Sequence, residues 1–272
     1  MALDSNARAR DILVGAALEA GEIALRFFRE AAATSARIDY KEGGSPVTEA
    51  DLAVDDFLRR RLGEAFPDAG WLSEETTDGA ERLRRAALLI VDPIDGTRAF
   101  IAGDPRWAVS IAYVRDGRPI AAVVSLPALG RAYGAAAGCG ATLNGAPIAV
   151  STAAGLDGAR AAGPKPLLEQ LARAAGAVFV PQPRIPSLAY RLALVASGDF
   201  EIAAAAGMSH DWDVAAADLV IEEAGGRLSG LDGAALLYNR PDPRRAALLA
   251  APAALSAALA AKLRMAANRA AA

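Results

Sequence analysis

Apolar residues recur at helical spacing in two stretches near the start of the chain. In residues 7–28, the apolar side chains stand three or four positions apart: Ile12, Ala16, Ala20, Ile23 and Phe27. Residues 48–65 have similar spacing, and the expected buried side consists of Leu52, Phe57, Leu58 and Leu62. Because such spacing places apolar side chains on one face of a helix, both stretches are predicted to be amphipathic helices.

Short apolar runs between turn signals predict β-strands. Two such runs, residues 71–73 and 88–91, are followed by acidic residues: Glu74 and Glu75 after the first, Asp92 after the second. Because Pro93 follows Asp92, the second strand is expected to end there in a forced bend. Further strands are predicted at residues 107–114, 120–125 and 132–136, with hairpin signals at Asp116-Gly117 and Asn144-Gly145.

The pattern changes after a stretch of small residues and Gly-Pro at residues 151–165. Beyond it, helices are predicted at residues 167–174, 188–197, 214–224 and the C-terminus, and strands at residues 178–180, 201–205 and 247–250. We therefore predict two halves. An N-terminal α+β half, residues 1–155, carries most of the candidate site, and an α/β half, residues 156–272, completes it.

Composition narrows the chemistry that the chain could perform. Its 272 residues include one cysteine, Cys139, and one histidine, His210. An internal disulfide, a thiolate zinc cluster and a histidine-rich metal site are therefore excluded. A metal site would have to use oxygen ligands, which suit Mg²⁺, Mn²⁺ or Ca²⁺. The net charge of −3 argues against a nucleic-acid binder.

Two segments bear on location. The first residues carry several charges without an apolar core, which is unlike a signal peptide. Residues 246–261 are rich in Ala and Leu, but they are too short to span a bilayer and contain Pro252. We therefore expect a cytoplasmic protein without membrane insertion.

Acidic residues gather in four segments, and each has an ordinary structural explanation. The run from Asp92 to Thr97 could be a surface turn, and Glu75 is expected to be a solvated residue of an acidic turn. Thr48 and Asp51 match a helix capping box. Asp213 could be a simple N-cap, and His210 is expected to have a local structural role and no catalytic one.

Taken together, however, the four segments resemble the inositol monophosphatase superfamily of magnesium-dependent, lithium-sensitive phosphatases. The resemblance runs over residues 41–251 and depends on three motifs: Leu72-Ser73-Glu74-Glu75, Asp92-Pro93-Ile94-Asp95-Gly96-Thr97, and Trp212-Asp213-Val214-Ala215-Ala216 with Glu223-Ala224-Gly225-Gly226. It implies an α/β fold, a layered αβαβα sandwich of the inositol monophosphatase and fructose-1,6-bisphosphatase type. The site is expected in the cleft between the two halves.

The resemblance also implies a role for each candidate residue. Glu74, Asp92 and the carbonyl of Ile94 would hold one Mg²⁺, and Asp92 would bridge to a second ion held by Asp95 and Asp213. Two or three Mg²⁺ ions are expected, with Mn²⁺ as a substitute. Thr97, paired with Asp51, would orient the attacking water together with Glu74. The substrate phosphate would meet Asp95, Gly96, Thr97 and Asp213, whereas the role of Lys41 stays open.

The substrate is less well specified. Arg98-Ala99-Phe100 resembles the 3′(2′),5′-bisphosphate nucleotidase branch or the histidinol-phosphatase branch of the superfamily. Leu72-Ser73-Glu74-Glu75 favours the nucleotidase, which is therefore the expected activity, with an inositol monophosphatase or a histidinol-phosphatase as alternatives. Arg184 or Arg191 could meet a second phosphate or could be solvated. Pro186-Ser187 replaces the usual Gly-Ser of the family, which puts substrate contacts from that loop in question.

Two other functional classes do not fit these residues. The spacing of Asp92 and Asp95 excludes the aspartyl nucleophile of haloacid-dehalogenase-type phosphatases, because Pro93 stands where the nucleophile would be. A catalytically silent metal or phosphate sensor would be expected to lack a ligand or Thr97, and none is missing. We therefore expect a hydrolase that acts on a small phosphorylated substrate; homodimers are common in the family.

Overall fold

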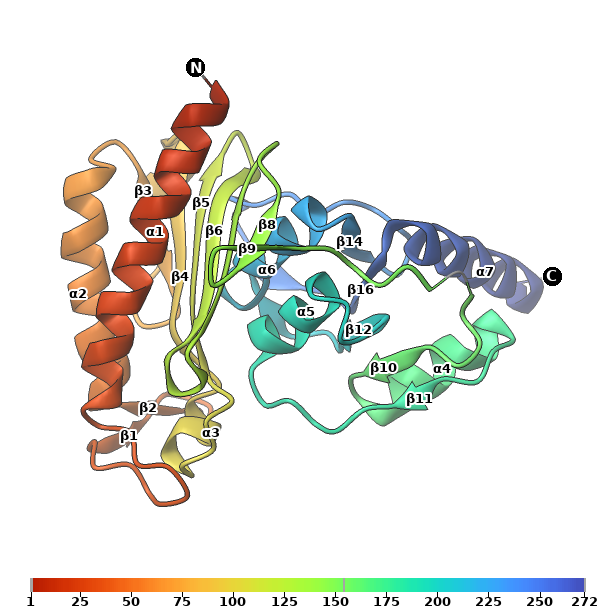
Figure 1. Cartoon of the computed structure of the whole chain (residues 1–272), viewed down its shortest axis with the longest axis horizontal. Helices are drawn as coiled ribbons and strands as arrows, with labels where there is room; N and C mark the ends of the chain where they lie inside the picture. The colour runs from red at the N-terminus through yellow and green to blue at the C-terminus, as the bar shows by residue number, and fades with distance from the viewer. Residues whose placement is uncertain (1, 154, 272) are drawn as a thin grey trace.

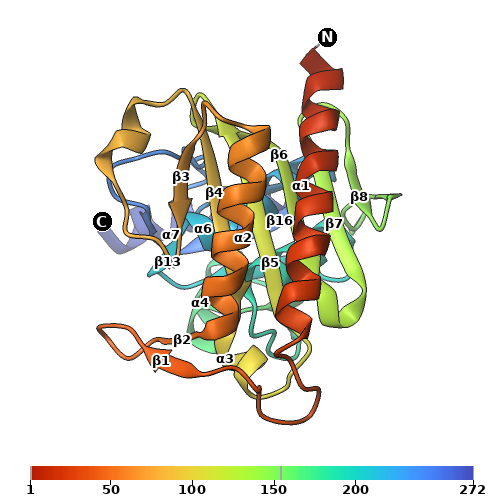
Figure 2. The same ribbon diagram turned by 90° about the vertical axis from the view of Figure 1, so that its left-hand side faces the viewer.

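Two long helices form the outer layer of the molecule. The computed structural model describes residues 2–153 and 155–271, and its first layer consists of α1 (Ala2–Leu25) and α2 (Glu49–Ala65). Both pack against one face of a large sheet (Figures 1 and 2). The prediction that α1 extends to Phe28 was wrong. The helix ends at Leu25, and beyond it the centroid of the Phe28 ring lies 5.7 Å from that of Phe100 and 5.6 Å from that of Trp107.

The buried face of α2 also differs from the prediction. Leu52 is 45% exposed, whereas Leu58 and Leu62 are fully buried. The face that contains these two leucines continues toward the start of the helix through Asp55 and Asp51, which are also buried. The helix is therefore rotated so that two carboxylates, and not Leu52, face the interior.

The second layer is a seven-stranded sheet in the order β3-β4-β5-β6-β7-β8-β9. Its strands are Gly70–Ser73, Ala87–Asp95, Ala108–Arg115, Arg118–Leu126, Arg131–Ala136, Ala141–Leu143 and Ala146–Ile148. The predicted hairpin turns are confirmed by left-handed backbone at Asp116 (φ 50°), Gly117 (φ 76°), Asn144 (φ 50°) and Gly145 (φ 81°). The turn at Asn144-Gly145 joins the short strands β8 and β9, for which no residue ranges were predicted.

Strand β4 does not stop at Asp92-Pro93, so that expectation was wrong. It continues to Asp95 alongside β5, with Asp92 opposite Ser110 and Asp95 opposite Ala108. The register shifts between these two pairs, so Pro93 lies in an irregularity where its missing N–H removes no regular ladder bond. The irregularity keeps both carboxylates at the end of a buried strand.

Two helices cover the other face of this sheet, α5 (Leu188–Ala196) and α6 (Asp211–Glu223). Beyond them lies a five-stranded sheet in the order β11-β10-β12-β16-β14. Its strands are Val180–Pro181, Arg160–Ala162, Ile202–Ala205, Leu248–Pro252 and Gly226–Gly230. The outermost layer is α4 (Lys165–Ala175) with α7 (Ala253–Ala271), and Figure 1 shows the layers from α1 to α7.

Buried apolar clusters fill the spaces between successive layers. The predicted αβαβα sandwich is thus confirmed. Strand β10 lies inside the stretch of residues 151–165 at which the pattern was expected to change, and the division into halves at residue 155 stays a prediction. Shorter elements complete the chain: β1 (Ile38–Tyr40), β2 (Pro46–Thr48), α3 (Thr97–Ile101), β13 (Ser209–His210), β15 (Arg244–Arg245) and the 3₁₀ turns Ala80–Arg84 and Pro127–Leu129.

Across residues 2–153 and 155–271, none of the helices combines the length and hydropathy that crossing a bilayer would require.

Candidate metal centre

The pairing of β3 with β4 brings Glu74 next to Asp92. The two strands run parallel, with Leu72 opposite Ile90 and Ser73 opposite Val91. Glu74 directly follows β3, and its backbone N–H donates to the carbonyl of Val91 at 3.3 Å. Because parallel strands end at the same edge of a sheet, the side chains that follow them lie close together.

Asp213 lies on the first turn of α6, the helix that covers the face of the sheet opposite to α1 and α2. Its Oδ2 accepts a hydrogen bond from the backbone N–H of His210 at 2.6 Å, which fixes the side chain at the helix start. It is therefore the third residue of the helix, and His210 is the N-cap in place of the predicted Asp213. One carboxylate oxygen from each of Glu74, Asp92 and Asp213 lies within 4.8 Å of the others.

Asp95 is held by the start of α5. Its Oδ2 accepts from Ser187 Oγ and from the backbone N–H of Ala189, both at 2.6 Å. Gly96 follows with a φ of 96°, and a Cβ there would lie 3.4 Å from the Ser187 nitrogen. Glycine suits this position both because of its left-handed backbone and because the two segments approach closely. Ser187 thus connects the end of β4 to the start of α5, despite the unusual Pro186 before it.

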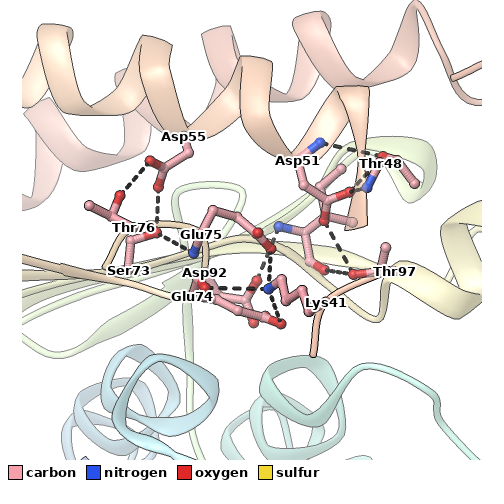
Figure 3. A network of polar contacts seen from close by, with 11 residues as sticks. Lys41, Thr48, Asp51, Asp55, Ser73, Glu74, Glu75, Thr76, Asp92 and Thr97 are labelled. Carbon is pink, nitrogen blue, oxygen red and sulfur yellow. Dashed lines mark hydrogen bonds and ion pairs between the residues drawn. The ribbon is translucent and has the colours of Figure 1, made fainter. Parts of the chain in front are cut away.

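Asp51 performs two tasks at once. Its Oδ2 accepts from the Thr48 backbone N–H at 2.8 Å and from Thr48 Oγ1 at 2.5 Å, which completes the predicted capping box of α2. Its Oδ1 accepts from Thr97 Oγ1 at 3.2 Å, and Thr97 Oγ1 also lies 3.1 Å from the carbonyl oxygen of Ile94 (Figure 3). Asp51 can therefore cap α2 with one oxygen and contact Thr97 of the site with the other.

Lys41 and Glu75 form a pair beside Glu74. Lys41 Nζ lies 3.0 Å from Glu74 Oε1 and 2.8 Å from Glu75 Oε1. The Glu75 side chain is only 3% exposed, so the expectation of a solvated residue was wrong. Burial opposes the charge of Lys41, but the two carboxylates outweigh that effect and raise its pKa. Burial raises the pKa of Glu75 to about 7.

The acidic side chains perturb one another strongly. Burial raises the pKa of Asp92 well above its usual range, and the charges of Glu74 and Asp95 add to the rise. Burial and the charge of Asp95 likewise raise the pKa of Asp213. Buried carboxylates this close repel one another unless a cation lies between them. An all-oxygen donor set with excess negative charge fits a hard divalent cation such as Mg²⁺.

The residues whose roles were left open lie around this cluster. His210 stacks on Trp212 with the ring centroids 4.4 Å apart, and its local structural role stays a prediction. Arg98 and Arg184 are exposed. Arg191 is half-buried, and its Nε has no hydrogen-bond partner among the described residues. These arginines do not approach the acidic cluster within ion-pair distance.

Sequence reasoning assigned no role to three residues of the surrounding network: Asp55, Ser73 and Thr76. Asp55 accepts hydrogen bonds from Ser73 Oγ and, at 2.9 Å, from Thr76 Oγ1. A signal for Asp55 was present, because it lies one helical turn after Asp51 and hence on the same face of α2. Nothing in the local pattern identified its partners, which come from a different element.

The comparisons with known proteins agree with this geometry. The sequence model of the inositol monophosphatase family matches residues 6–267. A histidinol-phosphatase from Mycobacterium tuberculosis (strain ATCC 25618 / H37Rv) is 41% identical over 211 residues, which cover 73% of this chain and 79% of that protein. The 3′(2′),5′-bisphosphate nucleotidase CysQ from Aggregatibacter actinomycetemcomitans is 30% identical over 243 residues, which cover 82% of this chain and 85% of that protein.

A solved structure supports the same assignment. The extragenic suppressor protein suhB from Bartonella henselae superimposes with a TM-score of 0.80 at 27% identity, covering 94% of this chain and 98% of that chain. The fold, the converging carboxylates and a family match over nearly the whole chain lead to one conclusion. The chain belongs to the inositol monophosphatase family and is a phosphatase of that family.

Proposed function

We propose that the protein hydrolyses the phosphate monoester of histidinol in a Mg²⁺-dependent reaction. The reaction class depends chiefly on one observation, the approach of Glu74, Asp92 and Asp213 to within 4.8 Å of one another. The choice of substrate is supported by the identity of 41% to a histidinol-phosphatase.

The proposed ligands are five groups: the carboxylates of Glu74, Asp92, Asp95 and Asp213 and the carbonyl oxygen of Ile94. Two or three Mg²⁺ ions would be held there, with Mn²⁺ as a substitute. When bound, Mg²⁺ would neutralise charge on the phosphate and lower the pKa of a bound water. The raised pKa of Asp92 supports this assignment, because burial and the charges of Glu74 and Asp95 all oppose its ionised form, which a bound cation would favour.

The remaining residues would act on the water and the phosphate. Thr97, held by Asp51 at 3.2 Å, would orient the attacking water together with Glu74. The backbone N–H groups of Gly96 and Thr97 would bind the phosphate, beside Asp95 and Asp213. Burial raises the pKa of Asp51 to about 6, although hydrogen bonds from Thr48 favour its ionised, accepting form. No histidine is needed as an acid or a base.

The bisphosphate nucleotidase that the sequence motifs favoured is now the weaker alternative. The relative that carries that name is 30% identical, compared with 41% for the histidinol-phosphatase. Arg98 fits either branch, because a basic residue followed by x-Phe was expected of a bisphosphate nucleotidase or of a histidinol-phosphatase, and its side chain is exposed. An inositol monophosphate stays a second alternative. A homodimer and a cytoplasmic location stay predictions.

One assay separates these substrates. kcat/KM is measured with Mg²⁺ for histidinol phosphate, inositol 1-phosphate and adenosine 3′,5′-bisphosphate. We expect the value for histidinol phosphate to be higher than the others by about tenfold or more, since a pocket built to pair a substrate's polar groups rejects analogues that lack them. A preference for either competitor would replace our assignment.

Asp92→Asn provides the control for the site. This variant should abolish turnover of every substrate, which would tie the measured activity to the acidic cluster. Absence of turnover of all three esters by the parent protein, with and without Mg²⁺, would instead favour a non-catalytic sensor.

A further inference from the structure

A second carboxylate of α2 has no part in the chemistry proposed above. Asp55 is 7% exposed and lies one helical turn after Asp51. At a rise of about 1.5 Å per residue, the two Cα atoms are about 6 Å apart along the helix axis. Asp51 contacts Thr97, whereas Asp55 contacts the segment that carries Glu74 (Figure 3). The same helix therefore contacts two sides of the site.

The contacts of Asp55 surround Glu74 in the sequence. Ser73 Oγ donates to Asp55 Oδ1, and Thr76 Oγ1 donates to Asp55 Oδ2 at 2.9 Å. Ser73 Oγ in turn accepts from the backbone N–H of Glu75 at 3.3 Å. Residues on both sides of Glu74 are therefore tied, directly or through one hydroxyl, to a single carboxylate.

This arrangement determines the direction in which Glu74 points. The hydroxyls of Ser73 and Thr76 are turned toward Asp55 of α2. The Glu74 side chain, in the bend that follows β3, lies beside Asp92 on the face of the sheet away from α2 (Figure 3). That face is the one from which Asp213 approaches, and there the oxygens of Glu74, Asp92 and Asp213 meet within 4.8 Å.

Loss of the hydrogen bonds between Asp55, Ser73 and Thr76 is expected to destabilise this segment. Ser73 is 2% exposed, so water does not readily replace Asp55 as the acceptor of its hydroxyl proton. Hydrogen bonds to a charged acceptor are about twice as strong as those between neutral groups. A variant without the charge would therefore leave the segment between Ser73 and Thr76 free to adopt other conformations.

We propose that Asp55 is a positioning residue of the metal centre: by holding Ser73 and Thr76, it presents Glu74 to Asp92 and Asp213 and so sets the affinity for divalent cations. The inference rests on the proposed function, because it needs a metal site at these carboxylates. Residues that orient metal ligands typically change metal affinity by about 10–100-fold when they are replaced.

The test is calorimetric titration of the full chain with Mn²⁺, well below the unfolding temperature. Asp55→Asn keeps the size of the side chain and removes its charge, and we expect its Kd for Mn²⁺ to rise by about tenfold or more. Ser73→Ala removes the same contact from the β3 side and should have a similar effect. The double variant should bind little more weakly than either single variant, because both changes break one interaction.

The matched control is Asp56→Asn. Asp56 is the next residue of α2, its side chain is 69% exposed, and its partner is Arg60 at 3.1 Å. This variant should bind Mn²⁺ as the parent does. If Asp55→Asn does not fold, Ser73→Ala decides the question.

The outcomes separate the two hypotheses. A parent protein that binds no Mn²⁺ would remove both the metal centre and the role of Asp55. A parent protein that binds Mn²⁺, with Asp55→Asn or Ser73→Ala within twofold of its Kd, would overturn this inference alone.

Discussion

Removal of divalent cations should destabilise the protein most strongly near neutral pH. Asp95 gives the order of magnitude of the effect, because burial raises its pKa from 3.8 to about 6. Each pKa unit corresponds to about 1.4 kcal/mol, so ionised Asp95 opposes folding of the metal-free protein by about 3 kcal/mol at about pH 7.5. Asp92 and Asp213 act in the same direction.

The sign of the pH dependence follows from this shift. An acid whose pKa is raised on folding binds more protons in the folded state, so its penalty is absent below the unfolded value and grows as the pH rises through the folded value. For Asp95 that window lies between 3.8 and about 6. Lowering the pH from about 7.5 to about 5 should remove roughly half of its penalty, or about 1.5 kcal/mol.

Thermal unfolding of chelator-treated protein measures this effect. A change of 1 kcal/mol shifts Tm by about 2–4 °C in proteins of this size, so Asp95 alone predicts a Tm about 3–6 °C higher at about pH 5 than at about pH 7.5. Mg²⁺ should raise Tm much more at the higher pH than at the lower one, since it compensates for repulsion that protonation otherwise relieves. Asp92→Asn should reduce both the pH dependence and the response to Mg²⁺.

The opposite pattern would refute the reasoning. If the chelated protein loses stability between about pH 7.5 and about pH 5, and Mg²⁺ raises Tm equally at both values, the carboxylates do not repel one another as the structure implies. Asp56→Asn is the control, because an exposed carboxylate in an i,i+4 pair should leave the profile unchanged.

Three further predictions concern single side chains. Thr97→Ala should lower kcat by about a hundredfold or more in steady-state kinetics. In urea titration the same variant should change the unfolding free energy by only about 1 kcal/mol. An unchanged kcat would reassign the water-orienting role. Lys41→Met should destabilise the chelated protein by about 1–2 kcal/mol in urea, and Mg²⁺ should recover part of the loss; a variant as stable as the parent would contradict the pairing with the two glutamates. Glu201→Gln should cost about 1–2 kcal/mol, discounted because its partner Arg160 is 44% exposed. The hydrogen bond from Arg160 lowers the pKa of Glu201 from 4.5 to about 2. This stabilisation is therefore present above pH 4.5 and is lost as the pH falls toward 2. Equal stability of parent and variant near neutral pH would contradict it.

The features that the sequence predicted well are encoded over a few neighbouring residues. The capping box of Thr48 and Asp51 forms within one turn of helix, and Asp116-Gly117 adopts the left-handed backbone that a tight hairpin needs. The helices α1, α2, α5 and α6 and the strands β5, β6 and β7 followed from hydrophobic patterns in the same way. Such signals need no knowledge of what lies across the fold.

The features that it missed depend on distant partners. Glu75 follows a strand in an acidic run, which is typical of a solvated turn, but Lys41 from the β1–β2 segment pairs with it and allows its burial. The role of Asp55 depends on Ser73, eighteen positions later in the chain. The extension of β4 depends on a register shift against β5 that only the paired strand reveals. In each case a tertiary contact overrides the local preference.

The carboxylates of the site also show why the same residues could be interpreted both as helix caps and as candidate site residues. Asp51 gives one oxygen to the start of α2, and Asp95 and Asp213 each give one to the starts of α5 and α6. A carboxylate has a second oxygen, which such a bond leaves available to the centre of the site. Helix starts carry partial positive charge, so they favour the carboxylates that assemble there before any cation binds. An asparagine at these positions retains one acceptor oxygen for the helix start and loses the charge, whereas an alanine loses both. Isosteric variants are therefore the ones that separate the chemistry of this centre from the stability of the fold.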